Sequence, residues 1–166
     1  MTYRSARLTA EHDTAAFECG VAVLDEWLHE QALRAERAGI SATTVWTRPP
    51  ESRVLAFYTI APTIVSREQL LAKEVAAGFS AIAGYLLGRL ALDRALRGKG
   101  LGSQLLLDAL DAIVAAADRG GGRVIVVDAT DDAAVAFYEH HNFVRVGDTR
   151  RLAMKIATAR NAIDSS

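Results

Sequence analysis

The stretch LRGKGLGSQLLLDAL, residues Leu96–Leu110, places three glycines among basic residues just before a leucine-rich run. The leucines recur at helical spacing, so the sequence predicts a helix that opens at the glycines. Glycine is a poor helix former, and helix stability is therefore given up at this end. A junction of small residues at a helix start turns several backbone N–H groups and the positive end of the helix dipole toward one point. We predict an anion-binding loop suited to phosphate.

The spacing of this loop excludes two common phosphate-binding motifs. A nucleoside-triphosphate loop has Gly-Lys followed by Ser or Thr, whereas Gly100 follows Lys99 here. A dinucleotide fingerprint needs glycine at the position of Ser103. The pattern that fits is R-x-x-G-x-G, formed by Arg97, Gly100 and Gly102.

The rest of the chain alternates predicted strands and helices. Runs of β-branched and aromatic residues predict strands, and apolar residues at helical spacing predict helices. We expect strands at 3–8, 40–48, 53–61, 85–93 and 123–130, a closing hairpin from 143–147 and 151–157, and helices at 21–38, 66–77, 101 onward and 132–141. The strand at 123–130 is almost continuously apolar, which favours burial on both faces and parallel pairing. Asp131 is expected to cap the helix that follows it.

The bulk composition describes a globular chain without a strong electrostatic preference. The chain has 166 residues, a formal net charge of −1 and a single cysteine, Cys19. This length fits one domain, and one cysteine excludes an internal disulfide, which favours a reducing cytoplasm. No run is apolar and long enough to predict export or membrane spanning. The near-zero net charge gives no sign of nucleic-acid binding by the molecule as a whole.

The loop and the element order together resemble the GNAT family of acetyl-coenzyme A dependent N-acetyltransferases. A second matching element is AVAFYEHHNF, residues 134–143, where Asn142 replaces the family's usual glycine. Asn tolerates the left-handed backbone that favours glycine there. The resemblance implies an α+β fold over residues 1–158, with a central mostly antiparallel sheet, a splayed parallel pair and flanking helices. We expect residues 159–166 to form a frayed tail.

A narrower resemblance, to the TacT-type toxins of this family, lies mainly in the first half. It rests on FECGVAVLDEWL, TTVWT and the stretch from Leu86 to Leu110. The resemblance implies a cytoplasmic homodimer that acetylates the α-amine of aminoacyl-tRNA with acetyl-CoA as co-substrate. It also implies a ribbon-helix-helix antitoxin as partner.

The resemblance assigns roles to individual residues. Tyr138 matches the general acid that protonates the departing thiolate, and a phenol stays protonated at neutral pH. Arg89 and Arg94 flank the expected reaction strand and are the leading contacts for tRNA phosphates, with Arg34, Arg37, Arg150 and Arg151 as secondary candidates. The cofactor-binding set is Leu90, Ala91, Leu92, Arg97, Gly98, Lys99, Gly100, Leu101, Gly102 and Ser103, and no metal is expected.

Two other functions remain open from the sequence. A metabolic or resistance-type N-acetyltransferase of a small amine is the main alternative, and the near-neutral net charge favours it. A catalytically idle acetyl-CoA sensor is the second, but retention of Tyr138 and of the complete glycine loop counts against it.

Overall fold

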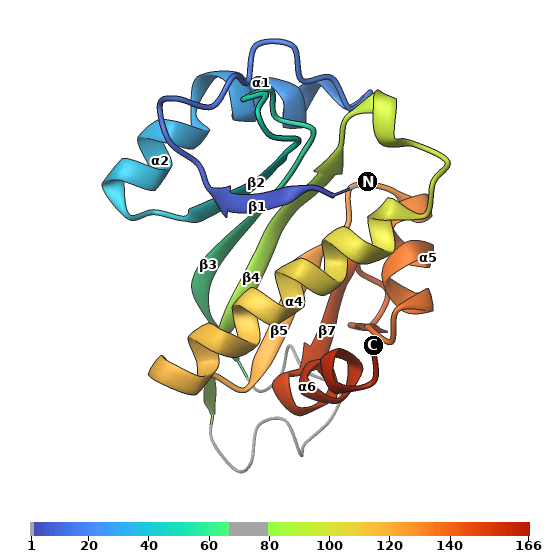
Figure 1. The fold of residues 1–166 in the computed structure, drawn as a ribbon. Coiled ribbons are helices and arrows are strands. Elements are labelled where there is room, and N and C mark those ends of the chain that lie inside the picture. Colours follow the sequence, from blue (N-terminus) through green and yellow to red (C-terminus); the bar gives the residue numbers. More distant parts are fainter. Residues whose placement is uncertain (1, 67–79) are drawn as a thin grey trace. The chain divides into compact units, whose positions relative to one another are not determined.

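The computed structural model describes residues 2–66 and 80–166 (Figure 1). The chain divides into two compact units, residues 1–61 with 89–106 and residues 62–88 with 107–166. The helix predicted at 66–77 lies almost entirely outside the described residues. Across the described ranges, no helix is both long and apolar enough to cross a membrane.

The strands form a sheet of seven in the order β1-β2-β3-β4-β5-β7-β6. Their bounds are β1 Arg4–Arg7, β2 Ala42–Thr47, β3 Ala56–Ser66, β4 Ala81–Leu92, β5 Val124–Asp128, β6 Val144–Arg145 and β7 Arg151–Lys155. β4 and β5 pair in parallel from Gly84–Val124 to Leu86–Val126, and β1–β2, β2–β3, β5–β7 and β6–β7 pair antiparallel. The mixed α+β fold, the parallel pair and both hairpins are thereby confirmed. β4 begins four residues earlier than expected.

In the first unit the helix predicted over residues 21–38 is two helices, α1 (Ala22–Glu30) and α2 (Ala32–Ala38). Gln31 between them has φ −121°, outside the helical range. Leu28 and Ala32 are both buried at helical spacing, so the apolar pattern continues across a break that only the backbone shows. α2 ends at Gly39 with φ +71°, the left-handed stop that glycine favours.

The core of the first unit is built from β-strand and loop residues against α1 and α2. Phe17 and Phe57 meet edge to face with ring centroids 5.3 Å apart. Val45 and Ala91, from β2 and β4, belong to the same buried cluster. This core includes residues from the segment before α1 and from the end of β4, where part of the candidate site lies.

Helix α4 (Leu101–Gly120) follows the glycine loop, as the sequence predicts. Its apolar stripe is buried: Leu105, Ala109 and Ile113 are each fully covered. The helix therefore uses its leucine-rich face for packing.

In the second unit, Asp131 caps α5 (Asp132–His140) through a 2.8 Å bond from the Ala134 N–H. Asn142, just after α5, has φ +70°, the left-handed conformation expected there. The predicted frayed tail differs: residues Ile156–Asp164 form helix α6. Ala159 is fully buried, and Arg160 pairs with Asp118 at 2.7 Å, so the end of the chain is held by packing and charge.

Candidate active site

The glycine loop adopts a backbone that only glycine accepts readily. Gly98 and Gly100 have φ +75° and +71°, and a Cβ at either position would meet nothing within 4 Å. Backbone conformation, not crowding by this chain, therefore requires glycine at both positions. The loop leads into the first turn of α4, whose N–H groups have no partner within the helix. Lys99 lies between the two glycines and is exposed.

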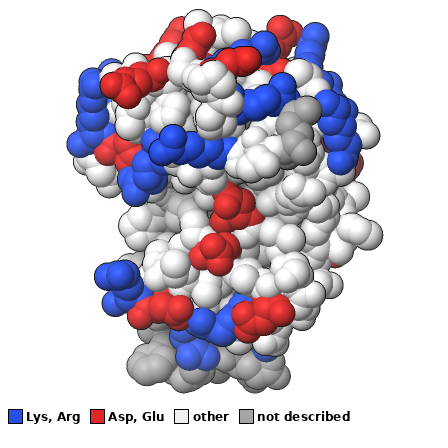
Figure 2. Space-filling model, in the orientation of Figure 1, with Lys and Arg blue, Asp and Glu red and all other residues white. Residues whose placement is uncertain are grey.

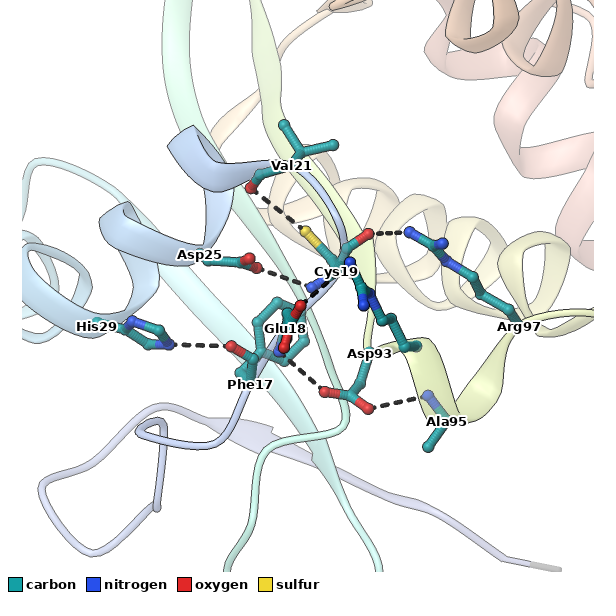
Figure 3. Close-up of polar contacts among 10 residues, drawn as sticks. Phe17, Glu18, Cys19, Val21, Asp25, His29, Asp93, Ala95 and Arg97 are labelled. Carbon is teal, nitrogen blue, oxygen red and sulfur yellow. Dashed lines mark hydrogen bonds and ion pairs between the residues drawn. The ribbon is translucent and has the colours of Figure 1, made fainter.

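The arginine of the R-x-x-G-x-G pattern is engaged elsewhere in the first unit (Figure 3). The Arg97 guanidinium donates a hydrogen bond to the Cys19 carbonyl. Gly20, the next residue, has φ +89°, and a Cβ there would lie 2.5 Å from an Arg97 guanidinium nitrogen. Arg97 thus occupies the space that a side chain at position 20 would fill.

A buried carboxylate stands at the start of the turn that leads to the loop. Asp93 is 2% exposed and accepts hydrogen bonds from the N–H groups of Glu18 and Ala95, each at 3.0 Å. The Arg53 guanidinium also approaches it at 3.4 Å. Asp93 therefore joins the 3-10 turn η2 (Arg94–Leu96) to the segment before α1.

Helix α1 holds the other side of that segment. Asp25 accepts a 2.9 Å hydrogen bond from the Cys19 N–H, and the His29 ring nitrogen lies 3.0 Å from the Phe17 carbonyl oxygen. The motif FECGVAVLDEWL thus contains both the segment 17–20 and Asp25, one of the two side chains that hold it, while His29 follows the motif directly. The family resemblance indicated the motif, but its partners in η2 and the loop follow only from the fold.

Arg89, a predicted acceptor contact, lies over the ring of Trp27, with its Cζ 3.8 Å from the ring centroid. Trp27 in turn stacks on Phe57 at 6.1 Å with an interplanar angle of 12°. Burial lowers the pKa of Arg89, and no carboxylate among the described residues pairs with it. Arg94 differs, because it is exposed and pairs with Glu18 at 3.1 Å.

The strand residues predicted to contact the donor alternate in burial. Ala91 packs into the core of the first unit, while Leu90 and Leu92 are half-buried on the other face of β4. These three residues, Arg89, Arg94 and the loop from Arg97 to Ser103 all belong to the first unit.

Tyr138 belongs to the second unit, where α5 places it in an aromatic cluster. Its ring meets Phe137 and Phe143 edge to face at 5.2 and 5.4 Å. The residue is 6% exposed, and burial raises the pKa of its phenol well above the ordinary value. The hydroxyl is therefore protonated at neutral pH.

The remaining basic candidates divide by their partners. Arg150 pairs with Asp132 at 3.2 Å and Arg151 with Asp128 at 2.8 Å, whereas Arg34 and Arg37 are exposed on α2. On the face drawn in Figure 2, basic and acidic side chains are interspersed. Within residues 2–66 and 80–166, no group of His, Cys, Asp and Glu is arranged to hold a metal ion.

Comparison with known proteins agrees with the fold and the loop. The acetyltransferase (GNAT) domain model matches residues 63–145. A tRNA-acetylating toxin of Mycobacterium tuberculosis is 35% identical over 158 residues, covering 95% of this chain and 94% of that protein. Among solved structures, the AtaT toxin complexed with acetyl-methionyl-tRNAfMet has a TM-score of 0.88 at 26% identity, covering 97% of this chain and 99% of that one.

A mutant of AtaT bound to acetyl-CoA and to the C-terminus of its antitoxin AtaR is also similar. It has a TM-score of 0.84 at 27% identity, covering 96% of this chain and 97% of that one. The matched domain, the near full-length relative and the strand-loop-helix geometry agree with one another. The chain belongs to the GNAT family of acetyltransferases.

Proposed function

We propose that this protein is a toxin that transfers an acetyl group from acetyl-CoA to the α-amine of aminoacyl-tRNA and so blocks translation. The observation that carries the proposal is the 35% identity to a tRNA-acetylating toxin over 95% of the chain. A GNAT domain alone would not identify the acceptor. This similarity extends through the first unit, which contains α1 and Arg89.

The residues of the glycine loop fit the diphosphate of acetyl-CoA. Gly98 and Gly100 leave open space beside left-handed backbone, and the first turn of α4 offers N–H groups. Such amides and the helix dipole favour an anion. Lys99 adds an exposed cation. Acetyl-CoA supplies the acetyl group as a thioester, and the backbone at Leu90–Leu92 is assigned to its acyl end.

Tyr138 is assigned the proton transfer to the leaving group. The acceptor amine attacks the thioester carbonyl, the new C–N bond forms as the C–S bond breaks, and the sulfur takes up the phenol proton. The nitrogen loses one proton to water, and the Tyr138 phenolate takes one back from water, so that the products are the amide and the free thiol. The raised pKa of Tyr138 keeps that proton on the phenol until the thiolate develops. The α-ammonium of an aminoacyl ester is more acidic than a lysine ammonium, because the adjacent ester carbonyl withdraws electrons from the nitrogen. The reaction therefore needs no strong base.

Arg89 is assigned to a phosphate of the acceptor. Its guanidinium is half-buried on Trp27 and has no carboxylate partner among the described residues, so its donors are available to an anion. Arginine presents those donors in a planar fork that suits phosphate. Arg94 is a weaker candidate, because Glu18 already neutralises it.

We also propose a ribbon-helix-helix antitoxin as the partner, a homodimer as the assembly and the cytoplasm as the location. The antitoxin is supported by the complexes of the similar AtaT toxin with AtaR. The location follows from the substrate, since aminoacyl-tRNA is used where translation takes place.

The proposal is tested by induced expression in a heterologous bacterium. The wild-type chain should arrest growth, and Tyr138→Phe should remove the arrest while accumulating to the same level. Co-expression of the cognate antitoxin should restore growth to the wild type. Vigorous growth with abundant wild-type protein would contradict a toxin and favour a small-amine acetyltransferase.

A further inference from the structure

We infer that Asp93 is a positioning residue for the acetyl-CoA loop. Its carboxylate fixes η2 against residues 18–20 and so sets where the glycine loop begins. The inference rests on the proposed function only in taking that loop as the donor site. Asp93 belongs to no glycine motif and is not assigned any contact with substrate.

The environment of Asp93 is that of a structural anchor. An ionised carboxylate is costly to bury unless hydrogen bonds compensate for the lost water. Here the Glu18 and Ala95 N–H groups supply two bonds at 3.0 Å, one from each segment that the carboxylate joins. The backbone N–H of Asp93 donates to the Leu55 carbonyl at 2.8 Å, which fixes the residue itself.

A second contact ties the far end of the same turn. Four residues after Asp93, Arg97 donates to the Cys19 carbonyl and leaves no room for a side chain at Gly20. The stretch from Asp93 to Arg97 is therefore attached at both ends to residues 18–20, as Figure 3 shows. Gly98, the first glycine of the loop, comes directly after the second attachment.

The segment that receives these contacts is itself immobilised. The carboxylate of Asp25 accepts from the Cys19 N–H, and His29 bonds to the Phe17 carbonyl, so two side chains of α1 hold it. The position of the glycine loop is consequently tied to α1 through residues 17–20, and Trp27 of α1 packs against Arg89. One network thus places both the donor loop and the proposed acceptor contact.

A charge effect and the loss of an anchor would change the affinity for CoA in opposite directions. Asp93 is an anion in the chain segment that leads to an anion-binding loop, so its neutralisation alone should strengthen the binding of CoA phosphates. Loss of an anchor should do the opposite. Asp93→Asn keeps the shape of the side chain but replaces one acceptor oxygen by a donor amide, which cannot receive an N–H.

The experiment measures the dissociation constant of free CoA by titration calorimetry with the full chain. For Asp93→Asn we expect CoA binding to weaken at least about tenfold, the usual size for a lost hydrogen bond to a charged group. In steady-state assays the KM for acetyl-CoA should rise while kcat at saturation stays within about threefold, because the reacting groups are untouched. Unchanged or tighter CoA binding overturns the inference.

Glu18→Gln is the matched control. It removes a carboxylate from the segment that Asp93 holds, but the Glu18 N–H that donates to Asp93 remains. Binding of CoA should be no weaker than in the wild type, because removal of an anion alone favours the CoA phosphates. Weakening equal to that of Asp93→Asn would overturn the assignment to the hydrogen bonds of Asp93.

Gly20→Ala is the second variant, and it tests the Arg97 attachment of the same turn if Asp93→Asn does not fold. Its Cβ would meet the Arg97 guanidinium, and the φ of +89° strains any side chain there, whereas the residues of the glycine loop are unchanged. It should weaken CoA binding while thermal unfolding stays well above the assay temperature. The binding of CoA is measured without an acceptor. Unchanged CoA binding in these variants would therefore overturn the role of Asp93 but would not bear on the acetylation of charged tRNA.

Discussion

The Cζ of Arg89 lies over the ring of Trp27, 3.8 Å from its centroid, and Trp27 in turn stacks on Phe57. An aromatic face stabilises a cation without neutralising it, as a carboxylate would. Arg94, only five residues away, is instead paired with Glu18. The two arginines that sequence alone ranks equally therefore differ in what they offer to a phosphate.

Arg89→Gln should raise the KM for aminoacyl-tRNA about tenfold and leave CoA binding unchanged, because one charge-assisted contact is lost. The slope of log KM against log salt should fall by about one. Arg89→Lys should recover little, since an ammonium cannot stack as a planar guanidinium does. Arg160→Gln is the control, because the charge of Arg160 is already paired with Asp118. It should change neither the KM for aminoacyl-tRNA nor the dependence of that KM on salt.

Tyr138→Phe should lower kcat at least about 100-fold and leave the Kd for CoA unchanged, because only the proton donor is removed. In the wild type, the raised phenol pKa means that ionisation of Tyr138 removes no activity up to about pH 9.5. Single-turnover rates measured between about pH 6 and 9.5 check both statements. A kcat close to that of the wild type in Tyr138→Phe would assign the proton to another group.

Gly100→Ala should destabilise the protein by about 1–2 kcal/mol, because its φ of +71° is a left-handed conformation. Gly102→Ala is the matched comparison, since Gly102 is the second residue of α4 and is not among the glycines with positive φ. There alanine should stabilise by up to about 1 kcal/mol. Chemical denaturation of both variants measures the two changes in the free energy of unfolding, which should have opposite signs. Equal changes would contradict the left-handed conformation of Gly100.

Burial raises the pKa of the Cys19 thiol to about 11. The thiolate is the reactive form, so alkylation by iodoacetamide at about pH 8 should be far slower than in the unfolded chain, where the thiol pKa is about 8.5. Because the folded state favours the protonated thiol, Cys19 contributes to the free energy of unfolding fully below the pKa of the unfolded thiol. This contribution is lost as the pH rises toward the pKa of the folded thiol. Cys19→Ala should therefore flatten the decline in stability between about pH 8.5 and 11. Rapid labelling of the native thiol would contradict its burial.

Asn142→Gly should leave stability within about 0.5 kcal/mol of the wild type, whereas Asn142→Ala should cost about 1 kcal/mol. The reason is the φ of +70° at the end of α5, which glycine adopts freely and alanine does not. Thermal unfolding of the two variants checks the difference. Equal unfolding midpoints would show that the left-handed turn contributes nothing.

Local signals predicted much of the fold. The leucine spacing of α4, the apolar run of β5 and the cap at Asp131 each act within a few residues, and all three are confirmed. The break at Gln31 was missed because burial of Leu28 and Ala32 keeps the helical period across it. Helix α6 was missed because its order depends on packing and on Asp118, which lies far away in the sequence.

The candidate site was predictable only in part. The glycine pattern is a local motif, and the left-handed conformation of Gly98 and Gly100 explains it. The contact between Arg97 and Cys19 spans 78 positions of sequence, and that between Asp93 and Glu18 spans 75. No periodicity or motif encodes such pairs, so their roles follow only once the chain is folded.

Acetylation of aminoacyl-tRNA is tested by measuring the transfer of labelled acetyl from acetyl-CoA to bulk aminoacylated tRNA. Deacylated tRNA and a panel of free small amines are run in parallel. We expect label on charged tRNA alone, with a rate that falls steeply as salt rises because phosphate contacts release counterions. Label only on small amines, with a flat salt response, would contradict this expectation.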